Sequence, residues 1–421
     1  MRVMWIVNTI FPKPAEELGL DRPLFAGWLL GLFEELKKNK KISQLIVATT
    51  YNGKILKRIQ DNNIVYYLIP NNSNNKYSKK QEQYWKQIKK HENPDVVHIH
   101  GTEYPHALCY LNSCGGNNVC TSIQGLINEC SKKNNYFADI TKFPITIRDI
   151  IRNDTVYQAR KKFEVRGKYE IKALEKSKII IGRTNWDKAH SFSITHKNNY
   201  EKCNESLRKI FYEKKWCIDN IERHSIFISQ ASYPLKGFHK MIDAAILLKK
   251  KYKDIKIYVA GTNITQNKTL KEKLKLSGYG KLLNQLIKKN ELENNIEFTG
   301  LLNEEQMCNR LLKSHIFVQA SSIENSPNSL GEAMILGMPC VASYVGGTAD
   351  MLLDKKEGFL YPFGESEMLA DYISQIFEND ELAIEFGKNA REHAIKTHNY
   401  KENANRIIEI YEKVISSTNE K

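Results

Sequence analysis

The sequence predicts an α/β protein built from two doubly wound domains, and three observations support this. Short apolar segments alternate with helical segments along the chain, as in parallel sheets whose faces are covered by helices. The length of 421 residues is enough for two domains that each bury a sizeable core. The alternation breaks at residues 190–222, which are rich in Lys, Asn and Glu, and it resumes at Ile226. We therefore expect one domain at residues 1–215 and a second at 220–400.

Strands are expected where a short run of apolar residues lies between polar or turn-forming residues. In the first domain the expected strands are Val3–Val7, Leu45–Ala48, Val65–Ile69, Val96–Ile99, Val119–Ile123 and Ile179–Ile181. In the second domain they are Ile226–Ile228, Ile257–Ala260, Ile296–Thr299, Ile316–Gln319 and Cys340–Ala342. Continuous apolar runs of this kind are typical of strands that are buried on both faces of a sheet.

Helices are expected between the strands because apolar residues recur there at the spacing of one helix face. In the helix that follows Gly237, this face carries Phe238, Met241, Ile242 and Ala245. A final helix is expected at about 403–415, with Ile407, Ile408, Ile410, Tyr411 and Val414 on its apolar side.

Composition limits the class of protein. Apolar residues make up 41% of the chain and aromatic residues 10%, which excludes a disordered protein. No segment approaches the roughly 18 consecutive apolar residues of a spanning helix, and the apolar start of the chain is too short for a secretory signal. The eight cysteines are scattered without C-x-x-C spacing, as in reduced core residues, so we expect a cytoplasmic protein.

The strong positive charge needs its own interpretation. The formal net charge is +15 and the sequence pI is near 9.2. Three interpretations are open: a nucleic-acid partner, docking to anionic lipid or a phosphate-bearing substrate, or a Lys-rich surface without a specific partner. No basic-aromatic motif of a nucleic-acid reader is present, so we expect no nucleic-acid partner. A peripheral position at an anionic membrane stays open beside the third interpretation.

Two carboxylates eight residues apart, Glu324 and Glu332, mark the strongest candidate site. Glu324 follows the strand expected at 316–319, and turn-forming residues then lead into a helix expected at about 330–336. Glu324 therefore lies in a strand-to-helix loop, and Glu332 lies one turn inside the helix. Carboxylates accept hydrogen bonds from hydroxyls, and the N–H groups between them form a helix N-terminus that attracts anions. The pattern predicts a site for a ligand that carries hydroxyls and phosphate.

Further candidates lie at the carboxyl ends of other strands, where open α/β sheets bind ligands. Lys236 stands at the start of a helix, where a cation is unfavourable against the helix dipole unless an anion is nearby. Gly261 and Gly300 mark two more loops at the same rim.

Three histidines, His98, His100 and His106, gather at the end of one strand in the first domain. His98 and His100 share a strand face, and His106 begins the following helix. Their spacing permits zinc, but no acidic or Cys side chain accompanies them to complete a tetrahedral ligand set, and no Asp-x-Asp metal motif stands at a strand end of the second domain. We therefore expect no metal and no cofactor.

These motifs resemble the donor-site segment of the retaining glycosyltransferases of family 4. That family has the GT-B architecture, in which two Rossmann-like domains face each other across a cleft. The resemblance rests on Glu324-x7-Glu332, Ala333-Met334, Gly337-x-Pro339 and Val345-Gly346-Gly347. It implies that the first domain holds the acceptor, that the second binds the nucleotide sugar, and that a C-terminal helix at 401–421 crosses back to the first.

The resemblance also implies roles for single residues. Glu324 is implied to face the transferred sugar, and Glu332 to bind the nucleotide ribose. The backbone of Asn328, Ser329 and Leu330 is implied to contact the donor diphosphate, because Pro327 has no N–H to donate.

In other family members an Arg and a Lys neutralise the donor diphosphate. Lys236 matches this Lys, whereas Gln230 stands where the Arg is expected, so one phosphate cation is missing. The His loop resembles the acceptor-side loop, with the match open between His100 and His106 and His106 slightly preferred. Arg183 and Arg208 are candidate contacts to a phosphorylated donor or acceptor, and salt bridges are the equal alternative.

The function that the sequence predicts is a retaining glycosyltransferase of the hexosyltransferase type. We expect it to move a sugar from a nucleotide diphosphate to a glycan or lipid-linked acceptor, in cell-surface polysaccharide biosynthesis. The alternatives are a nucleotide-sugar epimerase or phosphorylase of the same architecture, and a non-catalytic protein that binds polyanions.

Overall fold

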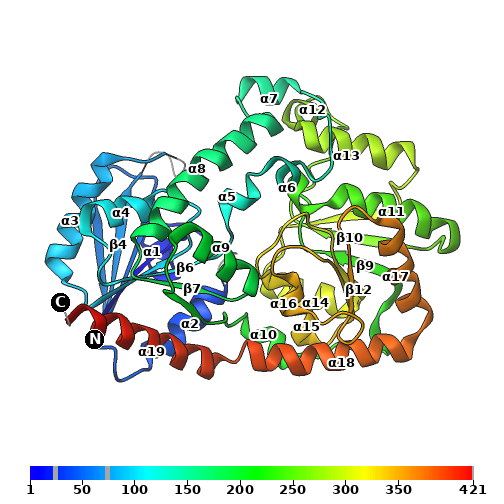
Figure 1. The fold of residues 1–421 in the computed structure, drawn as a ribbon. Helices are drawn as coiled ribbons and strands as arrows, with labels where there is room; N and C mark the ends of the chain where they lie inside the picture. Colours follow the sequence, from blue (N-terminus) through cyan, green and yellow to red (C-terminus); the bar gives the residue numbers. More distant parts are fainter. Residues whose placement is uncertain (22–26, 72–75, 420–421) are drawn as a thin grey trace. The chain divides into compact units, whose positions relative to one another are not determined.

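The computed structural model describes residues 1–21, 27–71 and 76–419, and it divides into two compact units (Figure 1). Unit 1 comprises residues 1–129, 162–206 and 398–421, and unit 2 comprises residues 130–161 and 207–397. The predicted α/β class, with two largely parallel sheets, is confirmed. One expected boundary differs from the structure, because residues 130–161 pack with the second unit although we had placed them in the first domain.

Unit 1 is built on an eight-stranded sheet with the order β3-β4-β2-β1-β5-β6-β7-β8. Its neighbouring strands pair in parallel, except that β3 is antiparallel to β4. The strands are β1 (Arg2–Ile6), β2 (Gln44–Tyr51), β3 (Lys57–Asp61), β4 (Ile64–Pro70), β5 (Val96–His100), β6 (Val119–Ser122), β7 (Ile179–Gly182) and β8 (Tyr200–Lys202).

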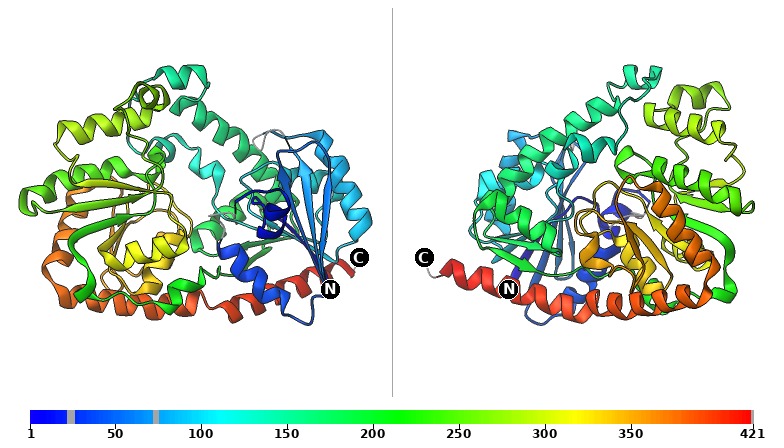
Figure 2. Two further views of the ribbon diagram at one scale, coloured as in Figure 1. Left: turned by 180° about the vertical axis from the view of Figure 1, so that it is seen from behind. Right: turned by 45° about the vertical axis from the view of Figure 1, so that its right-hand side comes forward.

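Helices cover both faces of this sheet (Figures 1 and 2). One apolar core lies between the sheet and the helices α2 and α19, and a second lies between the sheet and α3, α4 and α8. The helices are α1 (Pro12–Glu17), α2 (Gly27–Lys37), α3 (Lys79–Glu92), α4 (His106–Cys114), α5 (Ile127–Cys130), α8 (Val156–Lys176, whose first turns group with unit 2), α9 (Asn185–Thr195) and α19 (Tyr400–Asn419).

The last helix, α19, completes the core of the first strand. Its residues Ile407, Ile408 and Tyr411 are buried against β1 and α2. The buried Trp5 indole N–H donates to the Tyr411 hydroxyl at 2.9 Å, and that hydroxyl also lies 2.8 Å from His98 Nδ1. The C-terminal helix therefore belongs to the first unit, as the resemblance implied, and it is longer than the expected 403–415.

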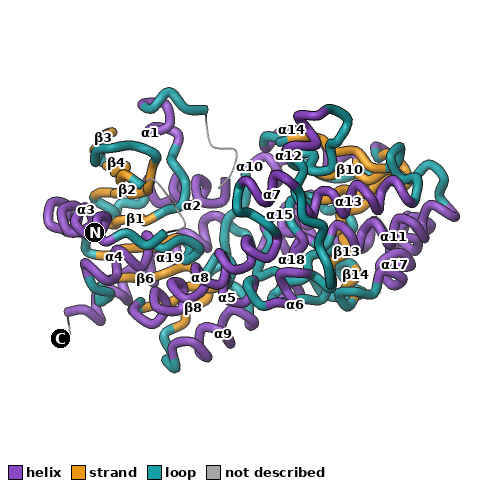
Figure 3. The backbone as a smooth tube through the Cα atoms, turned by 90° about the horizontal axis from the view of Figure 1, so that it is seen from above, coloured by secondary structure: helices purple, strands orange, loops and turns teal. Residues whose placement is uncertain are grey.

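Unit 2 is built on a six-stranded parallel sheet with the order β11-β10-β9-β12-β13-β14. Figure 3 shows its strands β10, β13 and β14 in orange. The strands are β9 (Glu222–Ile228), β10 (Lys256–Ala260), β11 (Ile296–Gly300), β12 (Ser314–Gln319), β13 (Cys340–Ser343) and β14 (Phe359–Tyr361). The helices are α6 (Lys133–Phe137), α7 (Ile147–Ile151), α10 (Lys209–Glu213), η1 (Ile218–Asn220), η2 (Pro234–Lys236), α11 (Phe238–Lys251), α12 (Leu270–Lys275), α13 (Gly278–Lys289), α14 (Glu304–Lys313), α15 (Asn328–Leu336), α16 (Thr348–Met351), α17 (Ser366–Glu378) and α18 (Asp380–Thr397).

All eleven predicted strands are present, and the residues that the structure describes form three further strands that were not predicted. The unpredicted strands are β3, β8 and β14. Each is the outermost strand of its sheet, and β8 and β14 have only three residues. An outermost strand pairs on one side only, so it needs neither the length nor the apolar run of a central strand.

Candidate active site

The candidate donor residues gather at the carboxyl edge of the second sheet. Strands β9, β12 and β13 are neighbours and run in parallel, so their carboxyl ends lie at one edge. The loop after β9 leads to Lys236, the loop after β12 carries Glu324, and the loop after β13 carries Gly346 and Gly347. This edge is where open α/β sheets bind ligands.

Glu324 is held by a cation and a hydroxyl. Lys236 Nζ lies 2.6 Å from Glu324 Oε1, and Ser321 Oγ donates to the same oxygen at 2.7 Å. The exposed side-chain fractions are only 13% for Glu324 and 20% for Lys236. Burial alone lowers the pKa of Lys236, but the attraction of the Glu324 carboxylate outweighs it and raises this pKa above its ordinary value. Lys236 is therefore a fixed positive charge at this edge.

Two glycines allow the loops around Glu324 to approach one another. Gly237 has φ +66°, and a Cβ there would lie 1.6 Å from the Ala320 carbonyl oxygen. Gly346 has φ +52°, and a Cβ there would lie 1.9 Å from the Glu324 carbonyl oxygen. The Gly347 N–H donates to that same carbonyl at 3.0 Å. Residues with a Cβ would push the backbone of the Glu324 loop away.

Glu332 lies in the first turns of α15 and is paired with Arg208. Arg208 Nε and Nη2 donate to the two carboxylate oxygens of Glu332, each at 2.6 Å. The Arg208 guanidinium also lies over the Phe211 ring at 4.8 Å. Burial raises the pKa of Glu332, and the two hydrogen bonds from Arg208 oppose that rise. Arg208 was a candidate phosphate contact, whereas here it fixes the orientation of a carboxylate.

The N-terminus of α15 offers backbone donors between the two glutamates. The helix begins after Pro327, which gives no side-chain cap. The N–H of Leu330, one of the three expected phosphate donors, donates to the Pro327 carbonyl at 3.1 Å. Within the part of the chain that the structure describes, the N–H groups of Asn328 and Ser329 have no acceptor. The Ser329 hydroxyl lies 3.0 Å from that of Ser229 in the loop after β9.

Gln230 and Gly261 stand in the loops after β9 and β10. Gln230 is partly exposed and reaches Ser232 Oγ at 3.5 Å, which leaves its amide weakly held. Gly261 has φ +103° with open space where a Cβ would lie, and its N–H donates to the Gly300 carbonyl at 2.9 Å. The two glycine loops that the sequence marked thus meet at one rim.

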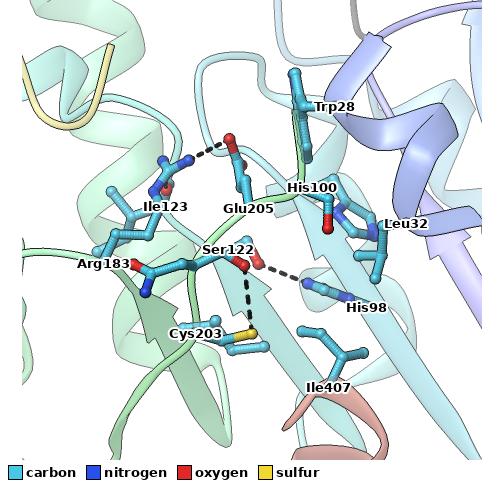
Figure 4. Close-up of a pocket in the computed structure, with 13 residues that line it drawn as sticks. Trp28, Leu32, His98, His100, Ser122, Ile123, Arg183, Cys203, Glu205 and Ile407 are labelled. Atoms are coloured by element: carbon cyan, nitrogen blue, oxygen red, sulfur yellow. Dashed lines mark hydrogen bonds and ion pairs between the residues drawn. The ribbon is translucent and has the colours of Figure 1, made fainter. Parts of the chain in front are cut away.

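In unit 1, His100 lines a small cavity at the end of β5 (Figure 4). Its ring packs on His98 with the ring centroids 3.7 Å apart and on Trp5 at 4.2 Å. Burial lowers the pKa of His100 well below its usual range, and neighbouring His98 lowers it further. Neither ring nitrogen has a hydrogen-bond partner among the described residues. The cavity volume of about 20 Å³ is on the scale of one water molecule, so a sugar does not fit into it.

His98 and His106 have different surroundings. His98 Nε2 lies 2.6 Å from Ser122 Oγ, and its other ring nitrogen contacts Tyr411. His106 begins α4, is 3% exposed and stacks on Tyr104 at 6.2 Å. Burial lowers the pKa of His106 to about 4. It is not among the residues that line the cavity beside His100, and its ring nitrogens lack partners within the described ranges.

Arg183 lies in unit 1 and is occupied there. Its Nη1 is 2.5 Å from Glu205 Oε2 (Figure 4), and its Nη2 donates to the carbonyl of Gln124 at 3.0 Å and to that of Ile123. Arg183 belongs to unit 1, whereas Lys236 and Glu332 belong to unit 2. Both candidate arginines, Arg183 and Arg208, form salt bridges.

The sequence alone did not reveal the partners of the two glutamates. Ser321 and Ser229 carry no motif, and nothing in the sequence pairs Arg208 with a carboxylate 124 residues away. Among residues 1–21, 27–71 and 76–419, no group of three or more His, Cys, Asp or Glu side chains is placed to hold a metal ion.

Comparisons with known proteins relate part of the chain to a family. Residues 210–393 match the family described as Glycosyl transferases group 1. The chain is 31% identical over 164 residues to the poly(ribitol-phosphate) α-N-acetylglucosaminyltransferase of Staphylococcus aureus. The matched residues make up 39% of this chain and 30% of that enzyme. It is 30% identical over 108 residues to the N-acetyl-α-D-glucosaminyl L-malate synthase of Bacillus anthracis. Here the matched residues make up 26% of this chain and 28% of that enzyme. The matches thus span less than a third of either relative.

The whole fold has counterparts among solved structures. The sucrose-phosphate synthase of Thermosynechococcus elongatus superposes with a TM-score of 0.72 over 99% of this chain and 100% of that chain. The sequence identity is only 14%, so this likeness concerns the fold. The architecture is that of the GT-B glycosyltransferases.

Proposed function

Residues 210–393 belong to the glycosyl transferases group 1 family, and on this basis we propose that the protein is a retaining glycosyltransferase. It moves a hexosyl group from a nucleotide diphosphate to a glycan or lipid-linked acceptor, in the synthesis of a cell-surface polysaccharide. The observation that carries the proposal is the placement of Glu324, Glu332 and the N-terminus of α15 at one edge of the second sheet. Nothing favours an epimerase, a phosphorylase or a non-catalytic polyanion binder.

The proposed chemistry follows from where charge develops. Departure of the diphosphate leaves an oxocarbenium-like sugar and concentrates negative charge on the phosphate oxygens. Lys236 and the N–H groups of Asn328 and Ser329 stabilise that charge, because fixed donors need no reorganisation during the reaction. Glu324 orients the sugar hydroxyls beside the bond that breaks. Lys236 serves both phosphate stabilisation and sugar orientation, because it also contacts Glu324.

We propose that Glu332 binds the ribose hydroxyls of the donor. A carboxylate offers about four acceptor positions, and the two hydrogen bonds from Arg208 use only two of them. The remaining positions accept from two neighbouring hydroxyls.

On the acceptor side the proposal places one of the two buried histidines, His100 or His106. What supports His100 is its position as the last residue of β5, at the carboxyl edge of the sheet where α/β sheets bind ligands, whereas the sequence had slightly favoured His106. Replacing each by Ala and measuring KM for the acceptor separates them. A rise in KM only for the His106 variant contradicts the choice of His100.

Donor binding tests the proposal as a whole. A nucleotide sugar that binds the folded state raises the unfolding temperature by mass action. We expect one of the UDP-, GDP-, ADP- or dTDP-sugars to do so, and UDP-N-acetylglucosamine is tested first because both relatives are named for N-acetylglucosaminyl groups. The anomeric configuration of the product, read by NMR, decides whether transfer is retaining. Inversion contradicts that part of the proposal.

We further propose that transfer needs no metal and no cofactor, and that it takes place in the cytoplasm. Lys236 supplies the positive charge that a divalent ion supplies elsewhere, and the eight cysteines are free thiols. Turnover is therefore expected to be unchanged by EDTA. Loss of turnover with EDTA, restored by a divalent cation, overturns the metal-independent reaction.

A further inference from the structure

Six aliphatic side chains of unit 2 point into solvent on two neighbouring helices and the loop before them. The two short helices α7 and α12 lie side by side (Figure 1). The exposed residues are Ile145 (56%), Ile147 (62%), Ile150 (70%), Ile151 (76%), Leu270 (75%) and Leu274 (49%). Clustered exposed apolar residues of this kind mark interaction sites on soluble proteins. We call these six residues and the lysines beside them the α7–α12 surface.

The orientation of α7 is fixed by a buried polar face. Asp149 is 1% exposed, and it accepts from the Gly278 N–H at 2.8 Å and from the Thr146 N–H at 3.3 Å. Arg148 adds an ion pair to Asp149 at 3.0 Å. The helix therefore turns its satisfied carboxylate inward and its isoleucines outward, which is the reverse of an ordinary surface helix. Ile147, Ile150 and Ile151 share the outer face through their i, i+3, i+4 spacing.

The second helix, α12, combines an apolar stripe with a basic one. Leu270 and Leu274 stand four residues apart on one face, and no residue of α12 is buried. Lys271 and Lys275 each follow a leucine by one position, and Lys273 is exposed as well. In the described part of the chain these three lysines have no ion-pair partner. Residues 140–155 and 268–275 together hold seven Lys or Arg and three Asp or Glu.

We infer that the α7–α12 surface docks on a bilayer that contains anionic lipid. The aliphatic side chains enter the interface between headgroups and acyl chains, and the lysines beside them attract the lipid phosphates. The charge of the rim selects this partner over an apolar surface of a second copy, because two copies of a basic rim repel each other.

The inference does not depend on the proposed donor chemistry. None of the six aliphatic residues is a candidate for donor or acceptor binding, and the test measures binding to vesicles. Within the described residues, no helix combines the length and the apolarity needed to cross a bilayer.

The test is flotation of the full chain with phosphatidylcholine vesicles, with and without phosphatidylglycerol. We expect the protein to float with the anionic vesicles at low salt and to be released as salt increases. Ile150→Ser combined with Ile151→Ser is expected to lower the partition coefficient roughly tenfold or more, since two strongly exposed aliphatic groups lose their contact with the bilayer. Replacing Lys271, Lys273 and Lys275 by Gln is expected to remove the preference for anionic vesicles.

The matched control replaces two exposed apolar residues of unit 1, Ile55 (64%) and Phe192 (56%), by Ser, and it is expected to float like the parent protein. The unfolding temperature and nucleotide affinity of all variants are expected to match the parent, because the changed side chains are exposed. The inference is wrong if the parent protein does not bind anionic vesicles, or if the Ile150/Ile151 variant floats as well as the control. It is also wrong if that variant only converts a dimer into a monomer in ultracentrifugation.

Discussion

Glu324 and Glu332 are both neutralised by a cation, but the two cations differ in what they can do. Lys236 is a point charge on a flexible stem, and it shares Glu324 Oε1 with the Ser321 hydroxyl. Arg208 is a planar fork that matches both oxygens of Glu332 at 2.6 Å. The lysine can therefore divide its charge between Glu324 and a phosphate, whereas the arginine holds one carboxylate in one orientation.

The first prediction concerns this orientation. Arg208→Lys keeps the charge but removes the bidentate contact, so we expect nucleotide affinity to fall by about 1–3 kcal/mol in calorimetry. In a Glu332→Gln background the same change is expected to cost much less, because the contact is already lost. Arg310→Lys is the matched control, since Arg310 pairs with Glu222 at 3.0 Å in the same unit. Equal affinity of Arg208→Lys and the control contradicts the positioning role.

The second prediction concerns the single phosphate cation. Lys236→Met is expected to lower donor affinity and turnover far more than Gln230→Ala, because the Gln230 amide carries no charge. Gln230→Arg is expected to keep or tighten donor binding, since a second cation offsets the diphosphate charge. Lys240→Met, whose ion pair with Asp139 spans 3.5 Å, serves as control. Normal turnover in Lys236→Met places the diphosphate elsewhere.

At the scale of elements, the loop after β12 is shaped by its neighbours. Gly237 lies against the carbonyl of Ala320 and Gly346 against the carbonyl of Glu324, so two other loops fix the path of the segment between these carbonyls. Strand ends of a parallel sheet thus place the glutamate, and glycines set how closely the loops approach.

The third prediction follows from this close approach. Gly346→Ala is expected to destabilise the fold by more than about 2 kcal/mol and to lower turnover, because the Glu324 backbone must move. Gly115→Ala is the control: Gly115 has φ +82° with nothing within 4 Å of a Cβ, so it reports the strain of positive φ alone. That strain is about 1–2 kcal/mol. Equal losses in thermal unfolding for both variants contradict the steric argument.

Elements that are stabilised by local signals were predictable from the sequence, whereas elements that depend on contacts with other segments were not. Buried central strands and the helix that ends at Gly337 were predictable, because an apolar run and a left-handed residue are local signals. The edge strand β3 has the sequence KRIQD with alternating exposure, and it exists only because β4 pairs with it. The use of the Leu330 N–H by Pro327 was likewise invisible, since it depends on the geometry of the first helical turn.

At the scale of the whole molecule, the chain passes between the two units four times, after residues 129, 161, 206 and 397. The segment 130–161 was assigned to the wrong unit because its anchors are long-range. Asp149 accepts from Gly278, and His239 Nε2 lies 2.8 Å from the Ala138 carbonyl. No local sequence pattern indicates such contacts. The change in composition therefore predicted only the passage between units near residue 206.

The fourth prediction concerns pH and both units. Burial lowers the pKa of His98 to about 3 and those of His239 and His315 to about 4. Unfolded histidine titrates near 6.5, so below that pH the unfolded chain binds more protons than the folded one. The free energy of unfolding is therefore expected to fall as pH decreases from 6.5 toward 4. Each group contributes up to about 1.4 kcal/mol per pH unit.

His315→Phe isolates one of these groups. His315 is fully buried and stacks on Phe377 at 4.8 Å, so a phenyl ring keeps the packing and removes the proton site. The variant is expected to be stable at pH 7.5 and to show a shallower decline of unfolding free energy between pH 6.5 and 4.5. A decline as steep as that of the parent contradicts the assignment.

The hydrogen bond between Trp5 and Tyr411 can form only after almost the whole described chain has been synthesised. Its partners are 406 residues apart, and a ribosome adding roughly 5–20 residues per second needs about 20–80 s to join them. Until then the indole N–H of Trp5 and the apolar residues of β1 that pack on α19 lack that helix in the growing chain. Strand β1 thus leaves the ribosome long before α19, and the part of its apolar face that this helix covers is available to chaperones until the helix has been made.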